Sequence, residues 1–225
     1  MDVGAAVDFP EADYIEVEQQ VAGYVARLGV SAPRPEGFAG FLGGWNALTM
    51  RFRAAAEESL AARMFLVRSQ GDLSAEDRYL QERALFGFFA NAMSAVESCC
   101  FTIYHLGQMR QPTFFALPDD RVTVSVTSDA FALAFPGTQV DVELSALKVA
   151  PDWLNIKSIR NTLVHRESPG ITIFAGAGTM PVRPAEWTGR EVVLEPSLVD
   201  IPRAWLGTAV ARLVGTTLDF VKTNF

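Results

Sequence analysis

The stretch SAEDRYLQERALFGFFANAMSAVESCCFTIYHLGQM, residues 74–109, decides the fold. It begins with Ser74, and an acidic residue stands three places further on, which resembles a capping arrangement at the start of a helix. Charged side chains keep its first turns in water, but after Leu85 the stretch is mostly apolar. A helix that is apolar around most of its circumference belongs at the centre of a bundle. We therefore predict one long central helix here.

Helical patterns lie on both sides of this central stretch. Apolar residues recur at helical spacing in residues 11–28, and strong helix formers with a charged outer face fill the later part of residues 38–67. Downstream, a proline and an acidic residue open residues 151–167, and a similar pair opens a last helix over about 200–221. These ranges predict four more helices around the central one.

Two segments instead have the alternation of short strands. Residues 112–149 contain V-T-V-S-V-T, and residues 170–195 contain I-T-I-F and E-V-V-L, with turn residues between the runs. We expect these two β-rich insertions to pair with each other, because isolated hairpins are only marginally stable. The sequence thus predicts a single domain over residues 1–225, mainly α: a helical bundle with a small β-strand elaboration around the helix at 151–167.

The composition is that of a globular protein with ample material for a core, since 49% of the 225 residues are apolar and 16 are Phe. The net charge of −7 argues against a protein that coats nucleic acid with its whole surface, because such binding needs many Lys and Arg. A local basic site on an acidic protein remains open, since phosphate recognition needs only a few positioned donors.

Cysteine usage and the N-terminus predict a cytoplasmic protein. Cys99 and Cys100 are adjacent, which fits a reducing compartment and is not the spacing of a zinc or redox motif. The chain begins with acidic residues, where a signal peptide would carry positive charge. Polar residues interrupt the apolar run at 84–106, which argues against a membrane span. We expect no metal, because the two histidines are far apart in the chain.

Site-like chemistry is concentrated in K-S-I-R-N-T-L-V-H-R, residues 157–166. At about 100° per residue, an apolar side of this helix can dock on the bundle, and a polar side is then presented. The apolar side is formed by Ile156, Ile159 and Leu163, and the polar side by Lys157, Arg160, Asn161 and His165. Val164 falls within the polar arc, where a small apolar residue marks contact with a partner helix.

These residue types suit cleavage of a phosphodiester without a metal. The guanidinium of Arg160 offers a fixed fork of donors that matches phosphate oxygens. The imidazole of His165 can both take and give a proton near neutral pH, and the amide of Asn161 can fix the orientation of a neighbour. One group would assist a ribose hydroxyl as the nucleophile, while another stabilises the charge that accumulates on phosphorus.

The run R-N-T-L-V-H, Arg160 to His165, resembles the R-x(4–6)-H motif of the HEPN superfamily (higher eukaryotes and prokaryotes nucleotide-binding domains), in which Asn often follows the Arg. The resemblance extends beyond the motif, because family members carry it on a late helix of a four- or five-helix bundle, after two long helices. The strand-like sequence before the motif is longer than the usual family connection, and more extended sequence follows it.

The resemblance implies a metal-independent endoribonuclease that acts as a toxin or defence protein. It implies that Arg160 stabilises the phosphate, His165 acts as acid or base, and Asn161 orients the site, while Lys157 and Arg166 add positive charge for binding. Family members commonly form homodimers in which two motif helices build one composite site, and toxins of this type have antitoxin partners. Other members are non-catalytic, so a module that binds a nucleotide, RNA or a protein is the alternative.

A second polar feature lies on the central helix, where Asn91, Ser94, Ser98, Thr102 and His105 form a stripe at spacings of three and four. Glu97 lies beside it. HEPN-like domains often place a polar or acidic residue from an earlier helix near the motif, so Glu97 and Ser98 are candidate partners of Arg160 or His165. The alternative is structural: small residues let helices approach closely, and buried hydroxyls bond to carbonyls one turn back.

The motif also has a purely structural interpretation. Arg160 would then pair with a surface carboxylate, and His165 would stabilise the C-terminal end of its helix through the helix dipole. The chain would then be an interaction or structural protein in which R-N-T-L-V-H has no chemical role.

Overall fold

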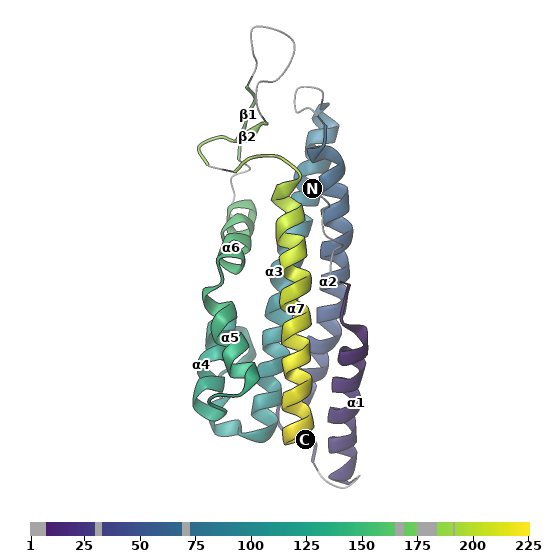
Figure 1. The fold of residues 1–225 in the computed structure, drawn as a ribbon, viewed down its shortest axis with the longest axis vertical. Helices are drawn as coiled ribbons and strands as arrows, with labels where there is room; N and C mark the ends of the chain where they lie inside the picture. Colours follow the sequence, from purple (N-terminus) through teal and green to yellow (C-terminus); the bar gives the residue numbers. More distant parts are fainter. Residues whose placement is uncertain (1–7, 30–32, 69–72, 165–168, 175–183, 191) are drawn as a thin grey trace.

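The structure is a computed structural model and describes residues 8–29, 33–68, 73–164, 169–174, 184–190 and 192–225. These residues form a bundle of α-helices with one very small sheet (Figure 1). The α-helices are α1 (Glu11–Arg27), α2 (Phe38–Leu66), α3 (Ala75–Arg110), α4 (Val124–Ala134), α5 (Gln139–Val149), α6 (Pro151–Val164) and α7 (Ser197–Asn224). The short elements are the 3-10 turns η2 (Pro112–Phe114) and η3 (Asp119–Arg121) and the strands β1 (Ile171–Thr172) and β2 (Glu186–Trp187).

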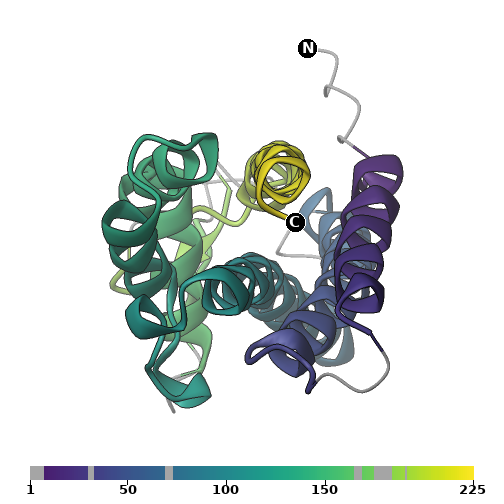
Figure 2. The same cartoon turned by 90° about the horizontal axis from the view of Figure 1, so that it is seen from below.

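The prediction that residues 74–109 form one central helix is confirmed. α3 contacts α2, α4, α6 and α7, and the end-on view in Figure 2 shows these helices around it. Ser74 is its N-cap, because the Ser74 Oγ accepts a hydrogen bond from the Asp77 backbone N–H at 3.0 Å. Its length and composition would also allow it to cross a membrane, but 61% of the relevant window is buried inside the fold, as in the core helix of a soluble protein.

α2 and α3 form a long antiparallel pair whose close approach depends on glycine. A Cβ at Gly40 would lie 2.4 Å from the His105 ring, and a Cβ at Gly44 would lie 2.4 Å from the Thr102 Oγ1. Side chains at these two positions would therefore force the helices apart. The first half of α2 can press against the stripe of small polar residues on α3 because it has hydrogen where other residues have a side chain.

The prediction of strands in residues 112–149 is wrong, because this segment folds into η2, η3, α4 and α5. Threonine provides both helix N-caps: the Thr123 Oγ1 accepts from the Val126 N–H, and the Thr138 Oγ1 accepts from the Asp141 N–H. The alternating valines misled the pattern analysis. Burial follows helical spacing, with positions 124, 127, 128, 130 and 131 buried in α4 and positions 140, 144 and 147 buried in α5. Packing against α3 and α7 overrides the local preference of valine for strands.

The sheet lies entirely within the second predicted insertion. β1 and β2 are antiparallel, with Ile171 opposite Trp187, and Val193 forms an isolated bridge to Glu186. The expected pairing of this insertion with residues 112–149 is therefore also wrong. A small β elaboration does follow the helix at 151–164, as the sequence predicted, and the buried indole of Trp187 fixes it to the core.

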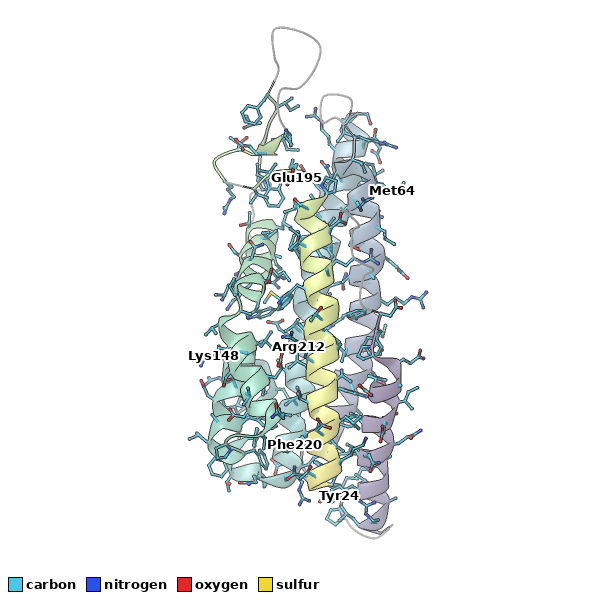
Figure 3. All side chains as sticks on the ribbon, in the orientation of Figure 1. Tyr24, Met64, Lys148, Glu195, Arg212 and Phe220 are labelled. Atoms are coloured by element: carbon cyan, nitrogen blue, oxygen red, sulfur yellow. The ribbon has the colours of Figure 1, made fainter. Side chains whose placement is uncertain are left out.

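α4, α5 and α6 stand beside α3 and α7 on the side away from α1 (Figure 1). Ala150 is the only residue between α5 and α6, and α5 packs on both α4 and α7. Figure 3 places Phe220 on α7 at the level of this group, where its ring centroid lies 5.4 Å from that of Phe131 and 4.9 Å from that of Phe135. Aromatic packing thus attaches the α4–α5 pair to the last helix.

Candidate functional site

The helix that carries the predicted motif is α6, and it docks as the sequence predicted. Ile156 and Ile159 are buried, and Leu163 packs against the core. α6 contacts α3 through this side. The polar side beside it is thereby presented, with Lys157 exposed and Arg160 and Asn161 half-buried.

Arg160 and Asn161 contact each other directly. The Arg160 Nη1 donates a hydrogen bond to the Asn161 Oδ1 at 3.2 Å. This bond restricts the guanidinium, so Asn161 orients the arginine rather than standing apart from it. His165 and Arg166, the other two residues of the predicted site on this helix, lie outside the described residues.

Glu97 of α3 is the acidic centre of the site. Burial raises the pKa of its carboxyl, while the positive charges of Arg160, Arg51 and Lys157 act in the opposite direction. Those three cations are therefore close enough to interact electrostatically with Glu97. The sequence named Glu97 as a candidate partner of Arg160, and the fold brings the two side chains into electrostatic range. We call Glu97, Arg51, Lys157 and Arg160 the charged cluster.

Ser98, the other candidate on α3, contacts α2 instead. The Ser98 Oγ accepts a hydrogen bond from the Arg51 Nη1 at 2.6 Å, and the same nitrogen donates to the Ser94 carbonyl at 3.3 Å. Arg51 is thus fixed to α3 by two bonds, and Ser98 positions Arg51. The sequence analysis missed Arg51. The available signal was its place one turn after Ala47 and two turns after Gly44, on the side of α2 that faces α3.

Arg190 is a second residue that the sequence analysis missed. It follows β2, and its Nη1 donates a hydrogen bond to the Thr162 Oγ1 on α6 at 3.0 Å. An exposed guanidinium from the β elaboration therefore lies against the motif helix. No sequence pattern indicated this contact, because it depends on how the segment after β2 returns to α6.

A pocket of about 450 Å³ opens next to the charged cluster and shares Arg51 and Glu97 with it. Its walls come from the first half of α2, the middle of α3 and the segment around η3. The lining residues are Gly43, Gly44, Ala47, Arg51, Glu97, Ser98, Phe101, Asp120, Val122 and Thr123.

Most of the polar stripe on α3 has a structural role. The Asn91 side chain donates to the Gly87 carbonyl, and the Thr102 Oγ1 donates to the Ser98 carbonyl, each one turn back along the helix. The His105 Nδ1 contacts the Gln108 Oε1 at 2.7 Å, and the ring is buried near the end of the helix. The structural interpretation of the stripe therefore applies to these three residues, while Ser94 and Ser98 contact Arg51.

Neither cysteine belongs to the site. Cys99 and Cys100 are both buried, and burial raises the pKa of the Cys99 thiol to about 12 and that of Cys100 well above its ordinary value. Thiols so far from ionisation are poor nucleophiles and poor metal ligands. Among the residues that the structure describes, no three His, Cys, Asp or Glu side chains gather in the manner of a metal site.

We expect the replacement Glu97→Gln to stabilise the protein increasingly as pH rises. Because burial raises the carboxyl pKa in the folded state, ionisation of Glu97 opposes folding. This cost is absent below the unfolded pKa and is fully present above the folded pKa. The free energy of unfolding of the variant should therefore rise relative to wild type as pH increases above about 4.3, the ordinary pKa of a glutamate carboxyl. Urea denaturation at several pH values measures it.

Glu57→Gln is the matched control for Glu97→Gln, because Glu57 is an exposed carboxylate in an i,i+4 pair with Arg53 on α2. Its difference from wild type should change much less over the same pH range, as is usual for surface pairs. A difference between Glu97→Gln and wild type that falls as pH rises would contradict the inferred burial of the carboxylate.

Comparison of the chain with family models, curated proteins and solved structures found no match.

Proposed function

We propose that this protein is a HEPN-like, metal-independent endoribonuclease of the toxin or defence type. The observation that carries the proposal is the charged cluster: Arg160 and Lys157 from α6 and Arg51 from α2 gather around the half-buried Glu97. The chain as a whole has a net charge of −7, yet three cations here act on a single carboxylate. Positioned guanidinium groups are the preferred partners of phosphate oxygens.

In the proposed reaction, the 2′-hydroxyl of a ribose attacks the adjacent phosphorus and loses its proton, and the bond from phosphorus to the 5′ oxygen breaks. The departing oxygen takes up a proton, so the products are a 2′,3′-cyclic phosphate and a 5′-hydroxyl. Arg160 stabilises the charge on phosphorus, and His165 moves a proton. Asn161 holds the Arg160 guanidinium through its amide oxygen, and Lys157, Arg166 and Arg51 attract the strand.

Glu97 supports this reaction by positioning the cations. A carboxylate between guanidinium groups orients them and limits their mutual repulsion. Its position on α3, the most buried helix of the bundle, makes it a fixed reference for side chains that come from α2 and α6.

We also propose that two copies of the chain form the working enzyme in the cytoplasm, with their α6 helices facing each other. Two apolar side chains on α6 are exposed in the single chain and support this arrangement: Leu154, which is 50% exposed, and Val164, which is 41% exposed. A cognate antitoxin that covers the charged cluster would then control the activity.

The decisive experiment incubates the purified protein with single-stranded RNA in EDTA, beside a His165→Ala variant. The proposal expects cleavage that survives chelation, yields 2′,3′-cyclic phosphate ends and is lost in the variant. Mass spectrometry of the fragments identifies the ends. Cleavage that EDTA abolishes would contradict the metal-independent mechanism, and equal cleavage by both samples would point to a contaminating nuclease.

The alternative is a non-catalytic HEPN-like module that binds a nucleotide, RNA or a protein. The same observation supports it, because guanidinium groups fixed by hydrogen bonds within the protein, as Arg51 and Arg160 are, can also bind a phosphate without reacting. RNA binding that persists without cleavage, in wild type and in the His165→Ala variant alike, would establish this alternative.

A further inference from the structure

We infer that the pocket between α2, α3 and η3 binds a guanine base of the RNA strand whose phosphate lies at the charged cluster. This inference rests on the proposed function for its substrate class. It adds a sequence preference, which the motif on α6 does not supply.

The pocket exists because of two adjacent glycines. A Cβ at Gly44 would lie 2.4 Å from the Thr102 Oγ1 and 2.9 Å from the Phe101 ring, so α2 passes α3 at minimal distance there. A Cβ at Gly43 would meet no atom within 4 Å, and this side of the helix is open. The result is a recess of about 450 Å³, which falls within the range of roughly 300–1,000 Å³ that is usual for small-ligand sites.

The charged groups in the recess match the edges of guanine. Guanine presents two acceptors, O6 and N7, to which arginine donates in the commonest specific base contact. Arg51 is held in place by the Ser98 hydroxyl and the Ser94 carbonyl, and it lines the recess. Guanine also carries neighbouring N1–H and N2–H donors, and the carboxylates of Glu97 and Asp120 are acceptors in the same recess.

The recess also contains an aromatic side chain, Phe101, on which a base can stack. Phe101 is only partly buried, and its ring is fixed edge-on against His105, with centroids 4.4 Å apart. Single-stranded RNA is recognised largely by stacking of unpaired bases on such rings, together with hydrogen bonds to base edges. Adenine and cytosine present fewer donors to a pair of carboxylates than guanine does. The recess therefore favours guanine over the other bases.

The position of the recess connects it to the proposed reaction. Glu97 belongs both to the recess and to the charged cluster that surrounds it. We place the phosphate of the bound nucleotide at Arg160 and Lys157, the two cations of α6 that act electrostatically on Glu97. On this inference, cleavage occurs next to guanine.

The experiment titrates guanosine 5′-monophosphate and adenosine 5′-monophosphate into the full-length protein by isothermal titration calorimetry. Both nucleotides carry the same phosphate, so the ratio of their affinities reports the base alone. We expect guanosine monophosphate to bind at least about tenfold more tightly, as one good two-point base contact provides. A Gly43→Leu variant should lose this preference, because the new side chain enters the recess.

Gly215→Leu is the matched control, because Gly215 lies within α7 and a Cβ there would approach only Asp13, at 4.0 Å. Both substitutions replace a helical glycine with a better helix former, so both variants should fold. The control should keep the guanine preference. Circular dichroism of each variant checks its helical content.

Each outcome separates the two proposals. Equal affinities for the two nucleotides in wild type, or no binding of either, would overturn the guanine recess whatever the RNA assay shows. A guanine preference in a protein that cleaves no RNA would leave the recess as a guanine-nucleotide site and overturn the nuclease. A guanine preference that Gly43→Leu leaves unchanged would place the base elsewhere and overturn the inference.

Discussion

Replacing Phe115 with alanine is expected to lower the free energy of unfolding by about 3–5 kcal/mol, the usual cost of removing a fully buried phenyl ring. Phe115 follows η2 and is 0% exposed. Its ring packs edge-on against Tyr104 and Phe131, with centroids 5.0 and 5.4 Å away. A Cβ at Gly107 would lie 2.3 Å from the ring, so the ring lies directly on the backbone of α3. Removing the ring leaves a cavity in a close-packed interior, which costs dispersion contacts as well as apolar burial.

Urea denaturation followed by circular dichroism measures this change. The adjacent Phe114→Ala variant is the matched control, since Phe114 is 45% exposed and its removal should change stability by less than about 0.5 kcal/mol. Similar losses in the two variants would show that Phe115 does not fix the start of the α4–α5 segment to α3. The denaturant dependence of unfolding should stay unchanged in both variants, because the folded core is otherwise the same.

Replacing Arg160 with alanine is expected to lower the rate of RNA cleavage by about 10²–10³-fold, the range seen when one preorganised donor to a developing charge is lost. The proposed nuclease uses this guanidinium to stabilise the charge on phosphorus. The side chain is half-buried on α6 and is oriented by the Asn161 amide. Thermal unfolding should change little, because the residues that dock α6, Ile156 and Ile159, remain.

Single-turnover cleavage of a short labelled RNA measures the rate constant for Arg160→Ala. Arg53→Ala is the control, because Arg53 is a strongly exposed arginine of α2 paired with Glu57, and the same charge is removed. Cleavage by that variant should stay within about threefold of wild type, as expected for a surface charge that acts only through long-range attraction. An Arg160→Ala variant that cleaves at the rate of the control would exclude Arg160 from the reaction.

The helical core of this protein could be predicted from its sequence because long helices carry a strong periodic signal. Residues 74–109 contained the N-cap, the charged first turns and the apolar run that α3 shows, and the predicted start of α2 at Phe38 is also correct. The prediction of strands in residues 112–149 failed for a physical reason. Valine prefers strands only weakly, and eleven-residue helices such as α4 and α5 are decided by the surface they pack on.

The candidate site was predictable on α6 and only in part elsewhere. Lys157, Arg160 and Asn161 follow from the helical periodicity of one segment. Glu97 was named because it lies beside the polar stripe and because HEPN-like domains often place an acidic residue near the motif. Arg51 could not be derived in the same way, because its contact with Ser98 depends on how closely α2 approaches α3. That distance is set by Gly40 and Gly44, where a Cβ would meet the side chains of α3. The joint position of Arg160 and His165 stays a prediction.

Because Ala150 alone links α5 to α6, the orientation of α6 depends on the orientation of α5. Any change that tilts α5 on α7 is transmitted along α6 to Arg160. Variation in the aromatic contacts of Phe131, Phe135 and Phe220 is therefore expected to shift Arg160 relative to Glu97 even when no residue of the charged cluster is replaced. If the protein is the proposed nuclease, substitutions in these distant aromatic residues should lower its activity.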